Sequence, residues 1–103
     1  MDRLTQLRQH LQTSPDDPFL QHALALELIK LGDDAGARTQ FEHLLEKDPT
    51  YVGSYYHLAK LLERQGRDEA AAAVYERGMA AATAAGDRRA LGELRSAYEE
   101  LTM

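Results

Sequence analysis

Residues 21–41 read QHALALELIKLGDDAGARTQF, and residues 55–75, which lie 34 positions further along the chain, read YYHLAKLLERQGRDEAAAAVY. The two stretches carry small, apolar and turn residues at matching positions. The matched pairs are Leu24 and Leu58, Ala25 and Ala59, Leu28 and Leu62, Gly32 and Gly66, Ala37 and Ala71, and Phe41 and Tyr75. A fixed period of this length is typical of repeat proteins, in which each repeat is one supersecondary unit.

Outside these stretches the same helical character continues, because Ala, Leu, Glu, Arg and Gln dominate and apolar residues recur at helical spacing. β-Branched residues are sparse, and no alternation of apolar and polar residues runs far, so strands are not expected. Short links predict that sequential helices are antiparallel neighbours. The expected helices span residues 2–12, 18–31, 34–47, 51–65, 68–86 and 88–101, and the predicted fold class is all-α.

Local signals mark the ends of these helices. Asp17 followed by Pro18 suits an N-cap and the first helical position, where a missing N–H costs nothing. Gly32 suits the left-handed residue that ends a helix. Thr50 is the expected cap of helix 51–65, and Asp87 is the expected cap of the last helix.

The repeated pattern resembles the tetratricopeptide repeat, whose motif reads Trp-x2-Leu-Gly-x2-Tyr, then Ala-x3-Phe, then Pro. The first copy here reads Gln21-x2-Leu24-Ala25-x2-Leu28, then Ala37-x3-Phe41, then Pro49. The second reads Tyr55-x2-Leu58-Ala59-x2-Leu62, then Ala71-x3-Tyr75, then Thr83. The resemblance covers about residues 18–85. It departs from the family at Gln21, where an aromatic residue is usual, and at Thr83, which replaces Pro and lets the fifth helix continue.

The resemblance implies a right-handed α-α superhelix made of two helical hairpins with flanking helices. We expect repeat units at residues 17–50 and 51–85, an N-terminal helix that is a partial repeat at 1–14, and a C-terminal capping helix at 86–103. One hairpin cannot bury its apolar face alone, so neighbouring hairpins share a core.

Composition narrows the possible functions of the chain. Its 103 residues correspond to one domain, and 12 basic against 17 acidic side chains give a net charge of −5. This acidic balance argues against a nucleic-acid partner, whose binding surface would be basic. No run of apolar residues is long enough to span a bilayer, and the start of the chain lacks a signal-peptide pattern, so we expect no membrane partner and a cytoplasmic location.

Catalytic and metal-binding signatures are not found in the sequence. No cysteine is present, no serine lies in a nucleophile elbow, and no glycine cluster could hold a phosphate. The acidic pairs at 16–17 and 33–34 lie where carboxylates stabilise helix starts. His22 and His57 occupy near-equivalent places in the two repeats, but a zinc site needs three or four converging ligands. We therefore expect no enzyme activity, no cofactor and no metal.

In the first helix of each repeat, a helical wheel separates the side that faces the core from the opposite side. In helix 18–31 the core stripe is predicted to be Leu24, Ala25, Leu28 and Leu31, and the opposite side carries Phe19, His22, Leu26 and Ile29. In helix 51–65 the opposite side carries Gly53, Tyr56, Lys60 and Glu63, with His57 and Arg64 at its margin. Repeat arrays bind ligands on their concave side, so these residues are the candidate groove.

The family resemblance implies a peptide or protein partner held in that groove. Members that clamp the C-terminal carboxylates of chaperones use Lys and Asn there, whereas this chain has His22, Leu26, Tyr56, His57 and Lys60. A two-carboxylate clamp is therefore not expected, although Tyr56, Lys60 and Arg64 suit an acidic or aromatic segment, with Arg95 as an extension. The alternative is self-association as a homodimer, or cover by the first helix, which would bury the apolar side of helix 18–31.

Two substitutions test the register of the repeat. Leu58→Ala is expected to lower the free energy of unfolding by about 2–5 kcal/mol, because it leaves a cavity. Ala71→Leu is expected to lower it by about 1–3 kcal/mol, because it overfills a close contact between helices. Chemical denaturation measures both, and a neutral result for either would show that the register is wrong.

Overall fold

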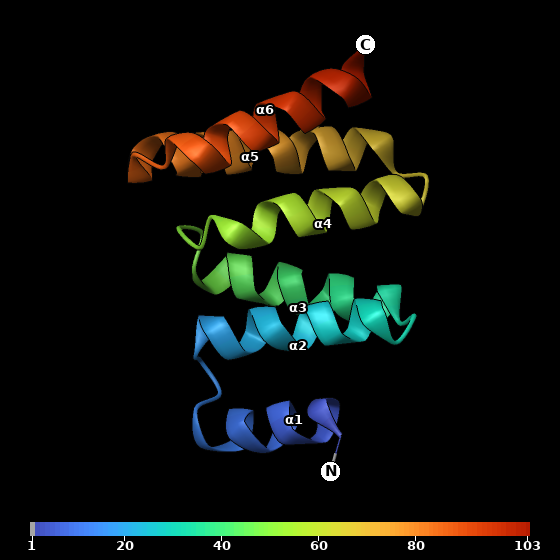
Figure 1. Cartoon of the computed structure of the whole chain (residues 1–103), viewed down its shortest axis with the longest axis vertical. Helices are drawn as coiled ribbons and strands as arrows, with labels where there is room; N and C mark the ends of the chain where they lie inside the picture. Colours follow the sequence, from blue (N-terminus) through green and yellow to red (C-terminus); the bar gives the residue numbers. More distant parts are fainter. Residues whose placement is uncertain (1) are drawn as a thin grey trace. The chain divides into compact units, whose positions relative to one another are not determined.

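The computed structural model describes residues 2–103, which form six α-helices and no strand (Figure 1). The helices are α1 (Arg3–Thr13), α2 (Pro18–Lys30), α3 (Asp34–Lys47), α4 (Gly53–Arg64), α5 (Asp68–Ala85) and α6 (Arg88–Thr102). The predicted all-α class is confirmed. The chain divides into two units, of which the first ends at Asp48 and the second begins at Pro49. Within residues 2–103, no helix combines the length and the hydropathy that a membrane span requires.

In the first unit, α2 lies between α1 and α3 and contacts both (Figure 1). The α2–α3 hairpin turns at Gly32, whose φ of 84° lies in the left-handed region. The Gly32 amide donates to the carbonyl of Ile29 at 2.9 Å, and the Asp33 amide donates to that of Leu28 at 2.8 Å. This pair of bonds satisfies the last carbonyls of α2 while the chain reverses, which confirms the expected role of Gly32.

The second unit repeats this turn between α4 and α5, and α6 follows them. Gly66 has a φ of 75°, and the amides of Gly66 and Arg67 donate to the carbonyls of Glu63 and Leu62 at 3.0 and 2.9 Å. The α4–α5 hairpin therefore closes in the same way as α2–α3. Gly86, with a φ of 70°, ends α5, and α6 packs back along α5.

The core of each unit is built from the residues that recur in the sequence. The alanines at four matched positions, Ala25, Ala37, Ala59 and Ala71, are 0% exposed, as are Phe41 and Tyr75. Leu58 and Leu62 are each 2% exposed. Alanine lets two helices approach closely, and the aromatic ring fills the space beside that contact. Leu7, which lies 34 positions before Phe41, is also buried.

Each repeat also has a side chain that fastens the preceding loop. Gln21 donates from Nε2 to the carbonyl of Pro15 at 2.7 Å, and Tyr55 donates from its hydroxyl to the carbonyl of Pro49 at 2.6 Å. Gln21 is 4% exposed and Tyr55 is 2% exposed. The departure of Gln21 from the family motif therefore preserves the hydrogen bond, because an amide N–H replaces the phenol as donor.

Most of the predicted helix caps are confirmed. Asp17, Asp33 and Asp87 accept hydrogen bonds from the amides of the first turns of α2, α3 and α6. Pro18 occupies the first turn of α2 as expected. These carboxylates also lie at the favourable end of the helix dipole.

The prediction that Thr50 caps the fourth helix is wrong. α4 begins at Gly53, and its N-cap residue is Val52, which has helical backbone angles and makes no side-chain capping bond. The amides of Ser54 and Tyr55 instead donate to the carbonyls of Tyr51 and Val52 at 3.3 and 3.2 Å. A tight backbone turn thus supplies the acceptors that a threonine hydroxyl was expected to supply.

The placement of Leu31 in the core is also wrong, since this residue is 59% exposed. α2 ends at Lys30, and Leu31 is its C-cap residue, so the chain has already begun to leave the helical path there. The wheel assumed that the helix continued for one more residue. Gln21 and Ala23 are buried in addition to the expected stripe.

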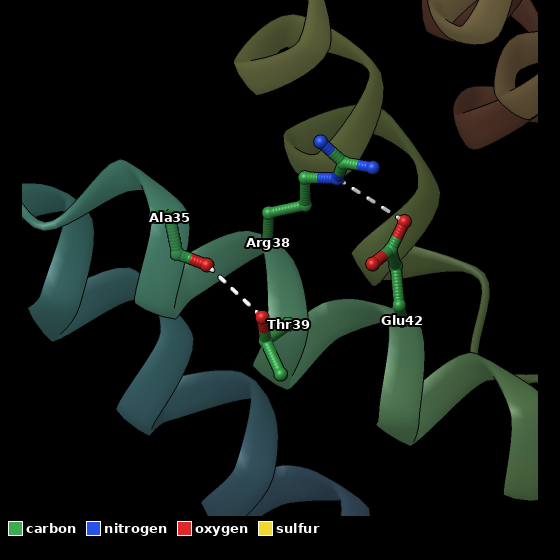
Figure 2. A network of polar contacts seen from close by, with 4 residues as sticks. All are labelled: Ala35, Arg38, Thr39 and Glu42. Atoms are coloured by element: carbon green, nitrogen blue, oxygen red, sulfur yellow. Dashed lines mark hydrogen bonds and ion pairs between the residues drawn. The ribbon is translucent and has the colours of Figure 1, made fainter.

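Two polar contacts form within α3 itself. Arg38 Nε lies 3.3 Å from a carboxylate oxygen of Glu42, and the Thr39 hydroxyl donates to the carbonyl of Ala35 at 3.2 Å (Figure 2). Pairs of this kind on a surface contribute little to stability. They do keep this side of α3 polar.

Helices of the second unit approach one another closely at Gly78 of α5. A Cβ atom at this position would lie 2.7 Å from Tyr55 Cβ in α4 and 3.2 Å from Leu94 Cδ1 in α6. Gly78 is buried, and the Tyr55 Cβ is fixed to its helix backbone and cannot turn away. The absence of a side chain at residue 78 therefore sets how near α5 comes to α4.

Gly78→Ala is expected to destabilise the protein by about 1–3 kcal/mol through overpacking, although alanine favours helices more than glycine does. Gly92→Ala in α6 is the matched control, because no atom lies within 4 Å of its added Cβ. That control should gain up to about 1 kcal/mol from helix propensity. Urea denaturation of both variants measures the difference, and equal shifts would contradict the close approach at Gly78.

Candidate functional site

The second unit has a groove of about 680 Å³ between α4 and α6. Its walls carry charged, hydroxyl and small side chains rather than a continuous apolar surface. The lining residues are Tyr56 and Lys60 from α4, and Arg88, Arg89, Gly92, Glu93, Ser96, Ala97 and Glu100 from α6. Two of the residues that the sequence assigned to a binding groove, Tyr56 and Lys60, are among them.

Tyr56 and Lys60 lie one helical turn apart, so they project from the same side of α4. The Lys60 ammonium lies 5.7 Å from the centroid of the Tyr56 ring, and its Nζ is 3.7 Å from a carboxylate oxygen of Glu63. Both contacts are partly exposed, so each contributes a modest free energy. Together they hold the lysine side chain against the α4 wall.

Glu63 is fixed in turn by Tyr75 of α5. The Tyr75 hydroxyl donates a hydrogen bond to the Glu63 carboxylate. Burial of the phenol, and secondarily this hydrogen bond, raises the pKa of Tyr75 above its usual value, so the hydroxyl remains a donor. The result is a chain of contacts from the core at Tyr75 through Glu63 and Lys60 to Tyr56 in the groove.

The α6 wall carries the other charges of the groove. Arg88 and Arg89 lie in the first turn of α6, while Glu93 and Glu100 lie one and three turns further on. Arg89 Nε is 3.3 Å from Glu93, but the Arg89 side chain is 91% exposed, so solvent screens this pair. Gly92 faces open space and leaves this part of the wall without a side chain.

The remaining residues predicted on α4 lie outside the lining of this groove. His57 is half-buried, and its ring meets that of Tyr56 edge to face at 5.8 Å. Burial lowers the pKa of His57 below its usual value, which favours the neutral imidazole. Arg64 and Gly53 are exposed.

The residues predicted on α2 are exposed to different extents. Phe19 is 65% exposed, whereas His22, Leu26 and Ile29 are half-buried. The His22 ring meets the buried Phe41 ring edge to face at 5.8 Å. His22 therefore borders the core, and Phe19 is the apolar side chain of this set that is most available to a partner.

The residues of the α6 wall were not predicted from the sequence, which indicated only that the sixth helix extends the candidate surface. Arg95, which was expected to extend the candidate surface, is exposed but does not line the groove. The signal was present in the spacing of Arg89, Glu93, Ser96 and Glu100, which recur every three or four residues and so share one side of a helix. Which side faces α4 depends on how α6 packs on α5.

Metal binding finds no support in the geometry. Within residues 2–103, no three His, Asp or Glu side chains come together in a way that could hold an ion. His22 and His57 have aromatic neighbours instead.

Two helical hairpins with matched turns, matched core alanines and matched loop anchors define a helical-repeat protein. The family model for the tetratricopeptide repeat matches residues 28–96, and the chain belongs to the tetratricopeptide repeat family. This fold generally serves as a protein–protein interaction module, and its domains are generally non-catalytic. No curated protein gives a significant match.

Solved structures are similar to this chain over most of its length. A tetratricopeptide repeat domain protein from Salinibacter ruber, solved in solution, is 42% identical with a TM-score of 0.81, and the match covers 84% of this chain and 88% of that one. A protein from Bordetella parapertussis is 26% identical with a TM-score of 0.84, covering 99% and 89%. The Sgt2 domain from Aspergillus fumigatus, at 21% identity and a TM-score of 0.73 over 96% and 68%, shares the fold.

Tyr75→Phe tests the contact that fixes Glu63. Loss of the phenol hydroxyl removes one hydrogen bond to a partly exposed carboxylate, so the free energy of unfolding should fall by about 1 kcal/mol. Tyr98→Phe is the control, because within the described residues the Tyr98 hydroxyl has no hydrogen bond. Thermal or urea denaturation should show a larger loss for Tyr75→Phe, and equal losses would mean that the Glu63 contact contributes nothing.

Proposed function

We propose that this chain binds a short segment of another protein in the groove between α4 and α6. The observation that carries the proposal is the groove itself, which is long enough to be lined by three turns of α6 and has a tyrosine and charged side chains along its walls. Tyrosine and arginine are the side chains that most often dominate binding at protein interfaces. The family generally provides interaction modules, which supports the same function.

The residues proposed to contact the segment are Tyr56, Lys60 and the α6 wall. Glu63 acts behind Lys60, and His57 and Arg64 flank the wall of α4. Phe19 and its neighbours His22, Leu26 and Ile29 are a proposed second contact surface on the first unit. No catalytic step and no cofactor enter this function, and we place the protein in the cytoplasm, where a partner chain would meet it.

Peptide selection followed by nuclear magnetic resonance tests this function. Random peptides selected on the immobilised protein should shift backbone amides of α4 and α6 when titrated into the labelled chain. Lys60→Glu should weaken binding by about tenfold. Lys47→Glu in α3, an equal change of charge on an exposed side chain outside the groove, should bind as the wild type does. If the selected peptides shift only amides outside α4 and α6, the proposal that this groove binds a segment is refuted.

Self-association is the second candidate, and the exposed Phe19 ring favours it. An exposed apolar patch often lies at a contact between proteins, and Phe19 shares one side of α2 with the half-buried Leu26 and Ile29. Sedimentation equilibrium over a wide concentration range separates the two: a homodimer that Phe19→Glu dissociates would support self-association, and a concentration-independent monomer would exclude it.

A further inference from the structure

The three cations of the groove differ in how their charge is balanced. Lys60 is paired with Glu63 at 3.7 Å and lies over the Tyr56 ring, and Tyr75 keeps Glu63 in place. A ligand carboxylate would have to compete with Glu63 for this lysine. Lys60 therefore offers a ligand mainly its alkyl stem and its contact with Tyr56.

Arg88 and Arg89 are not balanced in this way. Within the described residues Arg88 forms no ion pair, and the pair of Arg89 with Glu93 is exposed to solvent on both sides. Both arginines lie in the first turn of α6, where the helix dipole disfavours cations, and the carboxylate of the adjacent N-cap residue Asp87 accepts a hydrogen bond from the Ala90 amide. Their position lowers the stability of α6, so helix stability does not account for them.

Acidic side chains lie along the rest of the α6 wall. Glu93 and Glu100 line the groove beyond the arginines, and the protein as a whole has a net charge of −5. A uniformly acidic ligand would be repelled at that end and attracted only at the first turn of α6. The charge of the α6 wall therefore changes along the groove, from positive at Arg88 and Arg89 to negative at Glu93 and Glu100.

We infer that the partner segment carries acidic residues at one end, that these residues bind Arg88 and Arg89, and that a neutral or basic remainder lies along Glu93 and Glu100. This inference rests on the proposed function, since it names the chemistry of the segment that the groove takes. Planar guanidinium groups suit carboxylates because they donate two parallel hydrogen bonds. Tyr56, on the α4 wall of the same groove, supplies an aromatic contact.

A titration with two short synthetic peptides tests the charge preference. Both peptides contain one tyrosine and have blocked termini; one has two glutamates at its start, and the other has two lysines at the same positions. Titrated into the labelled protein, the glutamate peptide should shift the amides of the first turn of α6 and of Tyr56 at lower concentration than the lysine peptide, and added salt should weaken its binding.

Arg88→Glu is the decisive variant, because an acidic residue in the first turn favours the helix and leaves folding intact. It should weaken binding of the glutamate peptide by about tenfold. Arg95→Glu is the matched control, since it makes the same change of charge on an exposed residue of the same helix that does not line the groove. Equal effects of the two variants would overturn the inference.

The outcomes separate this inference from the proposed function. If both peptides shift the groove amides equally and Arg88→Glu changes neither, the groove binds peptides but the acidic preference is refuted. If neither peptide shifts the groove amides, the inference is refuted, and the peptides selected without bias of charge still decide whether the groove binds a segment at all.

Discussion

The helices of each unit hold together because they approach one another at residues that have almost no side chain. Ala59 and Ala71 are fully buried in the second unit, and Gly78 lies where even a methyl group would collide with Tyr55. This close approach brings large side chains such as Tyr75 into contact with several neighbours at once. It also places α6 beside α4, and the groove is a consequence of that placement.

The groove is connected to the core by polar contacts. Tyr75 is buried, yet its hydroxyl reaches Glu63, which orients Lys60 over Tyr56. One wall of the groove is therefore fixed by contacts that reach the core. The opposite wall has exposed arginines, of which Arg89 pairs with Glu93, so the two walls differ in their contacts with the core and in charge.

Sequence reasoning succeeded where local chemistry alone decides the outcome. Gly32 adopts the left-handed conformation and Asp17 caps its helix. The repeat also marked Ala25 and Ala37 as positions of close packing, and both are buried. Sequence reasoning failed for Thr50 and Leu31, which lie at helix ends. When the end of a helix lies one or two residues from its expected place, a different residue occupies the cap position. Gln21 looked like a departure from the motif, but it keeps the same hydrogen bond as Tyr55.

The sequence by itself determined the repeat of 34 residues, the helical hairpins and the family, because each depends on spacing along one chain. It also placed Tyr56 and Lys60 on the same side of α4. Only the tertiary structure decided that Arg88 and Arg89 line the same groove and that Gly78 is a point of contact. Those facts depend on the rotation of one helix against another, and side chains distant in sequence set that rotation.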